Sequence, residues 1–193
     1  MTRWIASVDY DKRSRERWDL YFYKICCAVA SKSPCLSRQI GAILVRDNSV
    51  VSTGYNGPPR GVSHCGSARL KTDQALIHEI AARGLEWKEE YNSMCPRKIL
   101  DFKSGEGLEW CPAQHAEENA VSNAARLGVS VNGTTLYLNT QPPCQRCLGT
   151  LINAGIVEIV ALTLNHYDPL VGLLMSNTEI LLRTFSFQEK ECH

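Results

Sequence analysis

The 193-residue sequence lacks an excess of charge of either sign, because 21 lysines and arginines stand against 20 aspartates and glutamates. A formal net charge of +1 offers no broad electrostatic surface for duplex nucleic acid or for an anionic membrane. We therefore expect a small-molecule partner, with neither duplex nucleic acid nor a membrane bound.

Long apolar runs are missing as well. The most apolar stretches, IGAILV (40–45) and PLVGLLM (169–175), are far shorter than the roughly 20 residues of a membrane-spanning helix. The first residues carry charges where a secretory signal peptide would need a continuous apolar stretch. We expect a cytoplasmic protein without a transmembrane segment.

Cysteine, in contrast, is abundant. The chain has nine cysteines, and an odd number cannot all be paired in disulfides. Metal ligation is the alternative use for the unpaired thiols.

The composition, 44% hydrophobic and 21% charged, is typical of a globular chain long enough for one core. We expect a single domain over 1–193. Segments with helical or strand periodicity alternate along it. They are a helix at 16–31, hairpin strands at 40–46 and 49–54, a helix at 116–128, a strand at 134–139, a helix at 144–155 and a strand at 156–162.

Two segments have weaker patterns. Residues 63–111 mix charges, glycine and proline around one helical pattern at 73–91, which indicates a loop-rich insertion. Residues 169–183 predict one or two short helices.

Two motifs at predicted helix starts supply the residues of a metal site. His115 precedes one helix, and Cys144 and Cys147 open the next. One imidazole and two thiolates give Zn²⁺ three ligands and leave the fourth tetrahedral position to water, which is typical of a catalytic site. Glu117 then faces that water as a general base. A CxxC pair alone more often indicates a structural zinc clip or a redox pair.

The motifs HAEENA (115–120) and PPCQRC (142–147) together match the HxE and PCxxC signature of zinc nucleobase deaminases. With CLSRQIGAILVRDNSVVSTGYNGPPRG (35–61), they resemble the deoxycytidylate deaminase family of the cytidine deaminase superfamily over roughly 16–168. The resemblance implies an α/β fold with three αβα layers, in which helices flank a mixed central sheet.

The resemblance also implies an activity, the zinc-dependent hydrolysis of dCMP to dUMP and ammonia, which supplies dUMP for thymidylate synthesis. Zinc lowers the pKa of its water, and Glu117 accepts the proton of that water and then protonates N3 and the departing amine, one proton at a time. No redox cofactor is needed.

The resemblance assigns substrate contacts with less precision. Backbone groups of Ala116 and of the loop from Thr140 to Pro143 lie against the pyrimidine, and Asn56 contacts the sugar. Arginine offers a permanent two-pronged charge for the 5′-phosphate, and Tyr167 follows the last sheet strand. The phosphate candidates are Arg38, Arg60 and Tyr167.

A second, structural zinc is implied by cysteines at positions where members of this family have them. They are Cys35, Cys65 and Cys111, with Cys95 favoured as a fourth ligand over His64 and His78. The alternative is a set of unligated thiols in the insertion.

The family resemblance further implies a homo-oligomer, with a hexamer favoured, that dCTP activates and dTTP inhibits, with Mg²⁺ accompanying the triphosphate. The regulatory candidates are Tyr55, Asn56, Gly57 and Arg126.

Two other functions stay open. A tRNA adenosine deaminase shares both motifs, although the near-neutral charge and the GYNG turn argue against it. A noncatalytic zinc-stabilised module would have no need of Glu117. Within the favoured family, dCTP is a further candidate substrate.

Overall fold

A computed structural model of the chain describes residues 8–103, 105–166 and 168–187. Its centre is a five-stranded mixed sheet in the order β2-β1-β3-β4-β5. β1 pairs antiparallel with β2 and β3, whereas β3, β4 and β5 run parallel. The strands are β1 (Gly41–Arg46), β2 (Ser49–Tyr55), β3 (Thr135–Leu138), β4 (Glu158–Ala161) and β5 (Leu181–Thr184).

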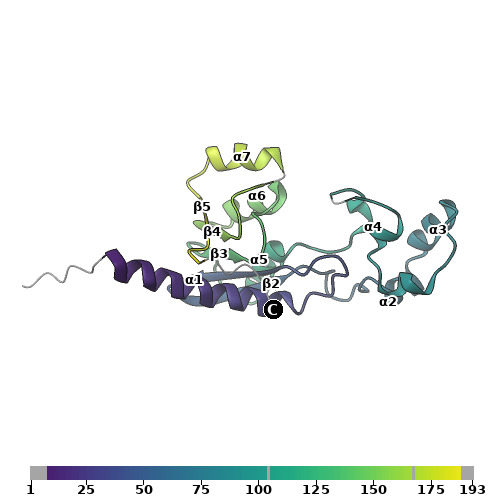
Figure 1. Ribbon diagram of the computed structural model, residues 1–193, viewed down its shortest axis with the longest axis horizontal. Helices are drawn as coiled ribbons and strands as arrows, with labels where there is room; N and C mark the ends of the chain where they lie inside the picture. Colours follow the sequence, from purple (N-terminus) through teal and green to yellow (C-terminus); the bar gives the residue numbers. More distant parts are fainter. Residues whose placement is uncertain (1–7, 104, 167, 188–193) are drawn as a thin grey trace, which may run out of the picture.

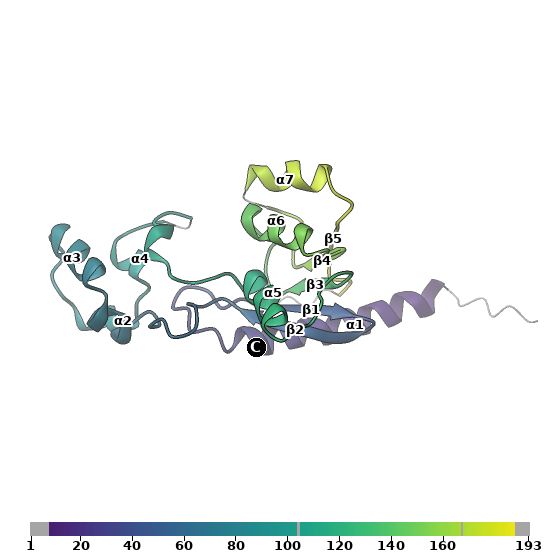
Figure 2. The same ribbon diagram turned by 180° about the vertical axis from the view of Figure 1, so that it is seen from behind.

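Helices cover both faces of the sheet, so the predicted three-layer αβα fold is confirmed (Figure 1 and Figure 2). α1 (Val8–Ala30) lies along one face. α5 (Ala116–Arg126) and α6 (Gln145–Asn153) lie on the other, and α7 (Pro169–Ser176) packs beside α6.

Alternation along β1 builds both halves of the core. Ala42 and Leu44 join the apolar cluster beneath α5 and α6, while Ile43 and Val45 join the cluster beneath α1. This is the period of two expected for a strand with both faces covered. The two layers are therefore fixed by the same strand register.

Two glycines let helices approach the sheet closely. A Cβ on Gly41 would lie 2.1 Å from the carbonyl oxygen of Cys26 in α1, and one on Gly54 would lie 2.2 Å from the backbone nitrogen of Ala120 in α5. Any larger residue at either position would push a helix away from the sheet.

The predicted hairpin is confirmed, and its turn chemistry explains it. Asp47 and Asn48 have φ angles of 50° and 56°, the left-handed values that a tight two-residue hairpin turn requires and that Asp and Asn tolerate.

The insertion lies to one side of the sheet layers (Figure 1). Its two ends meet where Gly57 and Gln114 exchange backbone hydrogen bonds of 3.1 and 2.9 Å. A separate apolar cluster forms its interior, made of Leu70, Leu76, Ile80, Tyr91, Ile99 and Leu100. Its helices are α2 (Ser67–Thr72), α3 (Gln74–Ala82), η1 (Glu89–Ser93), α4 (Pro96–Ile99) and η2 (Leu108–Trp110).

Three predicted elements were wrong in extent or kind. α1 begins at Val8, eight residues before the start predicted at residue 16. The helix expected over 73–91 ends at Ala82, because Gly84 turns the chain with a φ of 68° and η1 is a 3₁₀ turn. Residues 169–183 contain one helix, α7, and then the strand β5.

Long-range polar contacts explain β5. Arg183 donates to buried Asp19 of α1 at 2.7 and 3.1 Å and to Glu158 of β4 at 2.8 Å. Asp19 also accepts from the backbone and hydroxyl of Ser186. Partners distant in sequence thus hold this edge strand in place.

Within the described ranges, no helix combines the length and the apolar character that crossing a bilayer requires.

Candidate active site

The first half of the site is the start of α5. His115 is its N-cap residue, and the backbone N–H of His115 donates to a carboxylate oxygen of Glu118 at 3.2 Å. Ser52 of β2 donates to the carbonyl of Ala120 at 2.7 Å. The amide of Asn119 donates to the carbonyl of Tyr55 at 2.8 Å. These bonds fix both the tip of α5 and its seat on β2.

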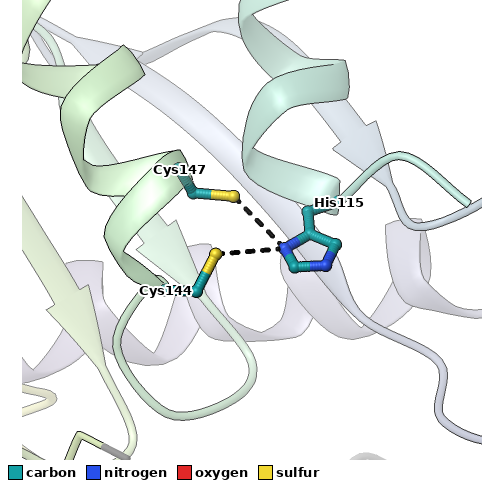
Figure 3. Close-up of side chains that lie close together, drawn as sticks. All are labelled: His115, Cys144 and Cys147. Carbon is teal, nitrogen blue, oxygen red and sulfur yellow. Dashed lines mark hydrogen bonds between the residues drawn. The ribbon is translucent and has the colours of Figure 1, made fainter. Parts of the chain in front are cut away.

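The second half is the start of α6, where Cys144 is the N-cap residue and Cys147 lies one turn later. The Nδ1 atom of His115 lies 3.5 Å from Sγ of Cys144 and 3.2 Å from Sγ of Cys147, and both sulfurs point at the imidazole (Figure 3). Two helix starts from separate parts of the chain thus converge on one point.

The pKa values of these three groups are shifted in different directions. A hydrogen bond from the Cys147 thiol lowers the pKa of Cys144 to about 4. A hydrogen bond to Cys144 raises the pKa of His115 to about 9. The pKa of Cys147 is raised because its proton is held against the Cys144 thiolate and because it is buried. Helix N-termini favour a thiolate in the same way.

The three side chains fit a zinc ion. Their ligand atoms all lie within 4.8 Å of one another, and tetrahedral zinc at ordinary bond lengths keeps its ligand atoms about 3.5–3.8 Å apart. Imidazole nitrogen and thiolate sulfur are the donors that zinc prefers. Binding must displace protons from His115 and Cys147, so zinc affinity should fall as the pH falls.

Glu117 lies two residues beyond His115 and is 6% exposed. Burial raises the pKa of its carboxyl group. A carboxylate with a raised pKa is a better proton acceptor near neutral pH. Glu117 is not a member of the three-residue ligand group.

The candidate base contacts adjoin the ligands. Ala116 is buried directly after His115, and Thr140 and Pro143 belong to the loop that leads from β3 to Cys144. The carbonyl of Thr140 accepts from the backbone N–H of Leu162 at 2.9 Å. This loop is therefore held between two strand ends beside the ligands.

The side chain of Asn56 is used inside the protein. Its Oδ1 accepts from Ser33 and from the backbone of Ile40, and its Nδ2 donates to the carbonyl of Arg38, all at 2.7–2.9 Å. Asn56 thus fixes the loop before β1.

The two arginine candidates differ in position. Arg38 is an exposed residue of the loop that Asn56 organises. Arg60 donates to Asn123 of α5 at 3.2 Å, about 12 Å along that helix from His115. Tyr167 lies outside the described residues.

The regulatory candidates lie in or next to β2 and α5. Tyr55 is 41% exposed at the end of β2, Gly57 is buried in the bridge to Gln114, and Arg126 is exposed in the last turn of α5.

The four cysteines of the second predicted site do not come together as ligands. In the described part of the chain, only His115, Cys144 and Cys147 form a group within 4.8 Å. Burial raises the pKa of Cys65, and the nearby Cys95 and Cys111 thiols raise it further. Arg69 reaches Cys65 at 3.9 Å and the carbonyl of Trp110 at 2.7 Å.

Sequence reasoning missed Asp168, whose carboxylate accepts from the backbone of Gln145 at 3.0 Å and of Leu170 at 3.1 Å. An Asp before Pro at a helix start is an N-cap signal that could have identified the second bond. The first bond joins different segments and has no local signal.

A mixed sheet with a His-Cys-Cys group and a buried glutamate at two helix starts defines the class of zinc-dependent deaminases. The family model described as "Cytidine and deoxycytidylate deaminase zinc-binding region" matches residues 16–163. The chain belongs to this family.

Individual relatives agree with this family. A deoxycytidylate deaminase of Saccharomyces cerevisiae is 33% identical over 176 residues, which are 91% of this chain and 47% of the yeast protein. The chain thus spans about half the length of that relative. A deoxycytidylate deaminase of Mycobacterium phage D29 is 32% identical, with 76% of this chain and 95% of the phage protein covered.

Among solved structures, the apo dCMP deaminase of cyanophage S-TIM5 aligns with a TM-score of 0.56 at 20% identity, covering 86% of this chain and 98% of that one. At this identity the alignment supports the fold.

Proposed function

We propose that the chain hydrolyses dCMP to dUMP and ammonia. The observation that carries the proposal is the convergence of His115, Cys144 and Cys147 beside the buried Glu117. The yeast and phage relatives named deoxycytidylate deaminase support dCMP as the substrate.

Each residue has a defined task in this reaction. His115, Cys144 and Cys147 hold zinc, which when bound supplies a Lewis acid that lowers the pKa of water at the fourth position. Glu117 accepts a proton from the attacking water, whose oxygen adds to C4 of cytosine. Glu117 then returns this proton to N3, takes a second proton from the new C4 hydroxyl group and gives it to the amine, so that the C4–N bond breaks and ammonia leaves.

The helix starts assist this chemistry. The positive ends of α5 and α6 stabilise the thiolates and the charge that develops as water adds to the ring. The backbone around Ala116 and the loop from Thr140 to Pro143 read the pyrimidine. We assign the 5′-phosphate to Arg38, Arg60 and Tyr167, and the sugar to Asn56.

A substrate panel tests the proposal. The purified chain is incubated with dCMP, deoxycytidine, CMP and dCTP separately, and product and ammonia are measured. Rapid formation of dUMP, faster than deoxyuridine from deoxycytidine, is the expected result. Inactivity on all four by a folded, zinc-loaded protein would contradict it and favour a tRNA adenosine deaminase or a noncatalytic module.

A second, structural zinc in the insertion belongs to the same proposal. Its support is the resemblance of the positions of Cys35, Cys65 and Cys111 to those of cysteines in this family, with Cys95 as the fourth ligand. Ligation requires these thiols to draw together, and a metal clip would stabilise a segment with a small core. Elemental analysis should find two zinc ions per chain, and one in Cys65→Ser.

The proposal extends to regulation and assembly. The chain would form a homo-oligomer, with a hexamer favoured, in the cytoplasm, where thiols stay reduced. It would bind dCTP with Mg²⁺ as an activator and dTTP as an inhibitor. The residues of this regulatory site would be Tyr55, Asn56, Gly57 and Arg126. Rates with each triphosphate in wild type and in Arg126→Ala test this site, and light scattering gives the oligomer. Equal rates with and without triphosphate would contradict it.

A further inference from the structure

Asp168 joins the starts of two helices. One carboxylate oxygen accepts from the backbone N–H of Gln145, the first residue of α6, at 3.0 Å. The other accepts from the N–H of Leu170 in the first turn of α7 at 3.1 Å. Gln145 directly follows Cys144, so the first bond lies one residue from a proposed zinc ligand.

The fold explains why these groups meet. β3 and β4 are parallel, so the loops that follow them leave the same edge of the sheet. The first loop leads to Cys144 and the second to Asp168. Val171 of α7 packs in the same apolar cluster as Leu148 and Leu151 of α6, which holds the two helix starts side by side.

The charge of Asp168 suits this place. Helix N-termini carry unsatisfied N–H groups and the positive end of the helix dipole. One carboxylate between two such termini is stabilised by both and in return fixes their mutual position. The bond from Gln145 to Asp168 thereby fixes the turn of backbone at the start of α6.

We propose that Asp168 is a positioning residue of the zinc centre. Cys144 is the N-cap of α6, with φ −68° and ψ 166°, and the direction of its sulfur depends on that turn of backbone. The bond from Gln145 to Asp168 holds the turn in the orientation that points Cys144 at His115. The inference rests on the proposed zinc ligation by His115, Cys144 and Cys147.

Zinc affinity tests this role without using activity. A chromophoric chelator competes for zinc with the full-length protein, and the relevant zinc is the one lost in Cys144→Ser. Asp168→Ala should weaken its binding about 10- to 100-fold, the usual cost of losing a group that orients a ligand. Asp168→Asn keeps an oxygen for Gln145 and should recover most of the affinity. The cobalt-substituted Asp168→Ala protein should show weaker thiolate-to-cobalt absorbance.

Gln145→Pro removes the donor from the other side. Proline suits the first position of a helix, and the extended Cys144 suits the residue before proline. Gln145→Pro should weaken zinc binding by a factor similar to that of Asp168→Ala, and the double variant should be no weaker than either one. Thr178→Ala, which removes a bond to Leu174 at the opposite end of α7, is the matched control and should bind zinc normally.

The outcomes separate the two proposals. Unchanged zinc affinity in Gln145→Pro, or effects of the two substitutions that add fully, would overturn the positioning role and leave the proposed function intact. Gln145→Pro decides the question alone when Asp168→Ala does not fold. If variants at His115 and Cys144 kept the zinc content of the wild type, the proposed function would be overturned instead.

Discussion

The sheet core and the insertion at 63–111 hold their side chains in place in different ways. In the core, strand alternation buries whole layers, and Leu44, Leu136 and Ile159 are completely inaccessible. In the insertion, one small apolar cluster is combined with the nearly buried Arg69, which is paired with Asp73 at 2.8 Å.

The difference shows where chemistry can be placed. The ligand group stands at helix starts that rest on the sheet, so its spacing is set by the most extensively packed part of the molecule. The cysteines of the insertion lie in turns and loops beside short helices around a small core, and they do not reach ligand spacing. Packing, more than residue type, separates the two cysteine sets.

The largest expected effect comes from comparing one cysteine of each region. Cys144→Ser should remove the catalytic zinc and lower dCMP turnover at least about a thousandfold, because metal stabilisation of the reaction amounts to several kcal/mol. Cys65→Ser should leave turnover within the same order of magnitude. Zinc content and dUMP formation measure both. Equal loss in the two variants would mean that the insertion also supports the chemistry.

An added methyl group should cost a different amount of stability in the two regions. Gly54→Ala places its Cβ 2.2 Å from α5 and should destabilise the fold by about 1–3 kcal/mol or more. Gly84→Ala meets open space at a φ of 68° and should cost only about 1 kcal/mol. Urea unfolding gives both values. A smaller cost for Gly54→Ala than for Gly84→Ala would contradict the close seat of α5.

The raised pKa of Glu117 predicts a pH dependence in metal-free protein. A carboxyl whose pKa is higher in the folded state favours folding fully below its unfolded pKa, and this contribution is lost as the pH rises. Glu117→Gln does not titrate, so its stability should exceed that of wild type increasingly from about pH 4 upward. Melting curves in chelator at several pH values test this, and a constant difference would contradict it.

The smallest expected effect has the opposite sign. Gly149 lies inside α6, and a methyl group added there would meet nothing within 4 Å. Gly149→Ala should therefore stabilise the protein by about 0.5–1 kcal/mol through helix propensity. Urea unfolding beside Gly54→Ala would show that contact, and not location in the core, determines the cost. A destabilised Gly149→Ala would break that explanation.

The parts predictable from sequence are those with local signals. Helical spacing in α5, the turn at Asp47 and Asn48, and the paired motifs at His115 and Cys144 all lie within a few residues of their cause. The fold class and the zinc ligand group were accordingly within reach of the sequence.

What escaped prediction depends on distant contacts. β5 is held by the bonds of Arg183 to Asp19 and Glu158, and its own residues have no strong strand pattern. The internal hydrogen bonds of Asn56 and the bridge made by Asp168 join separate segments in the same way. The helix expected over 73–91 was too long because Gly84 ends it against a continuing apolar pattern.

The most direct test of the central claim is the turnover of dCMP by Glu117→Gln with zinc content measured on the same sample. The variant removes the proton acceptor and leaves all three ligands in place. We predict that the zinc content equals that of the wild type and that the rate of dUMP formation falls by about a hundredfold to ten-thousandfold. A zinc-loaded Glu117→Gln protein that forms dUMP within tenfold of the wild-type rate would contradict the assignment of the site.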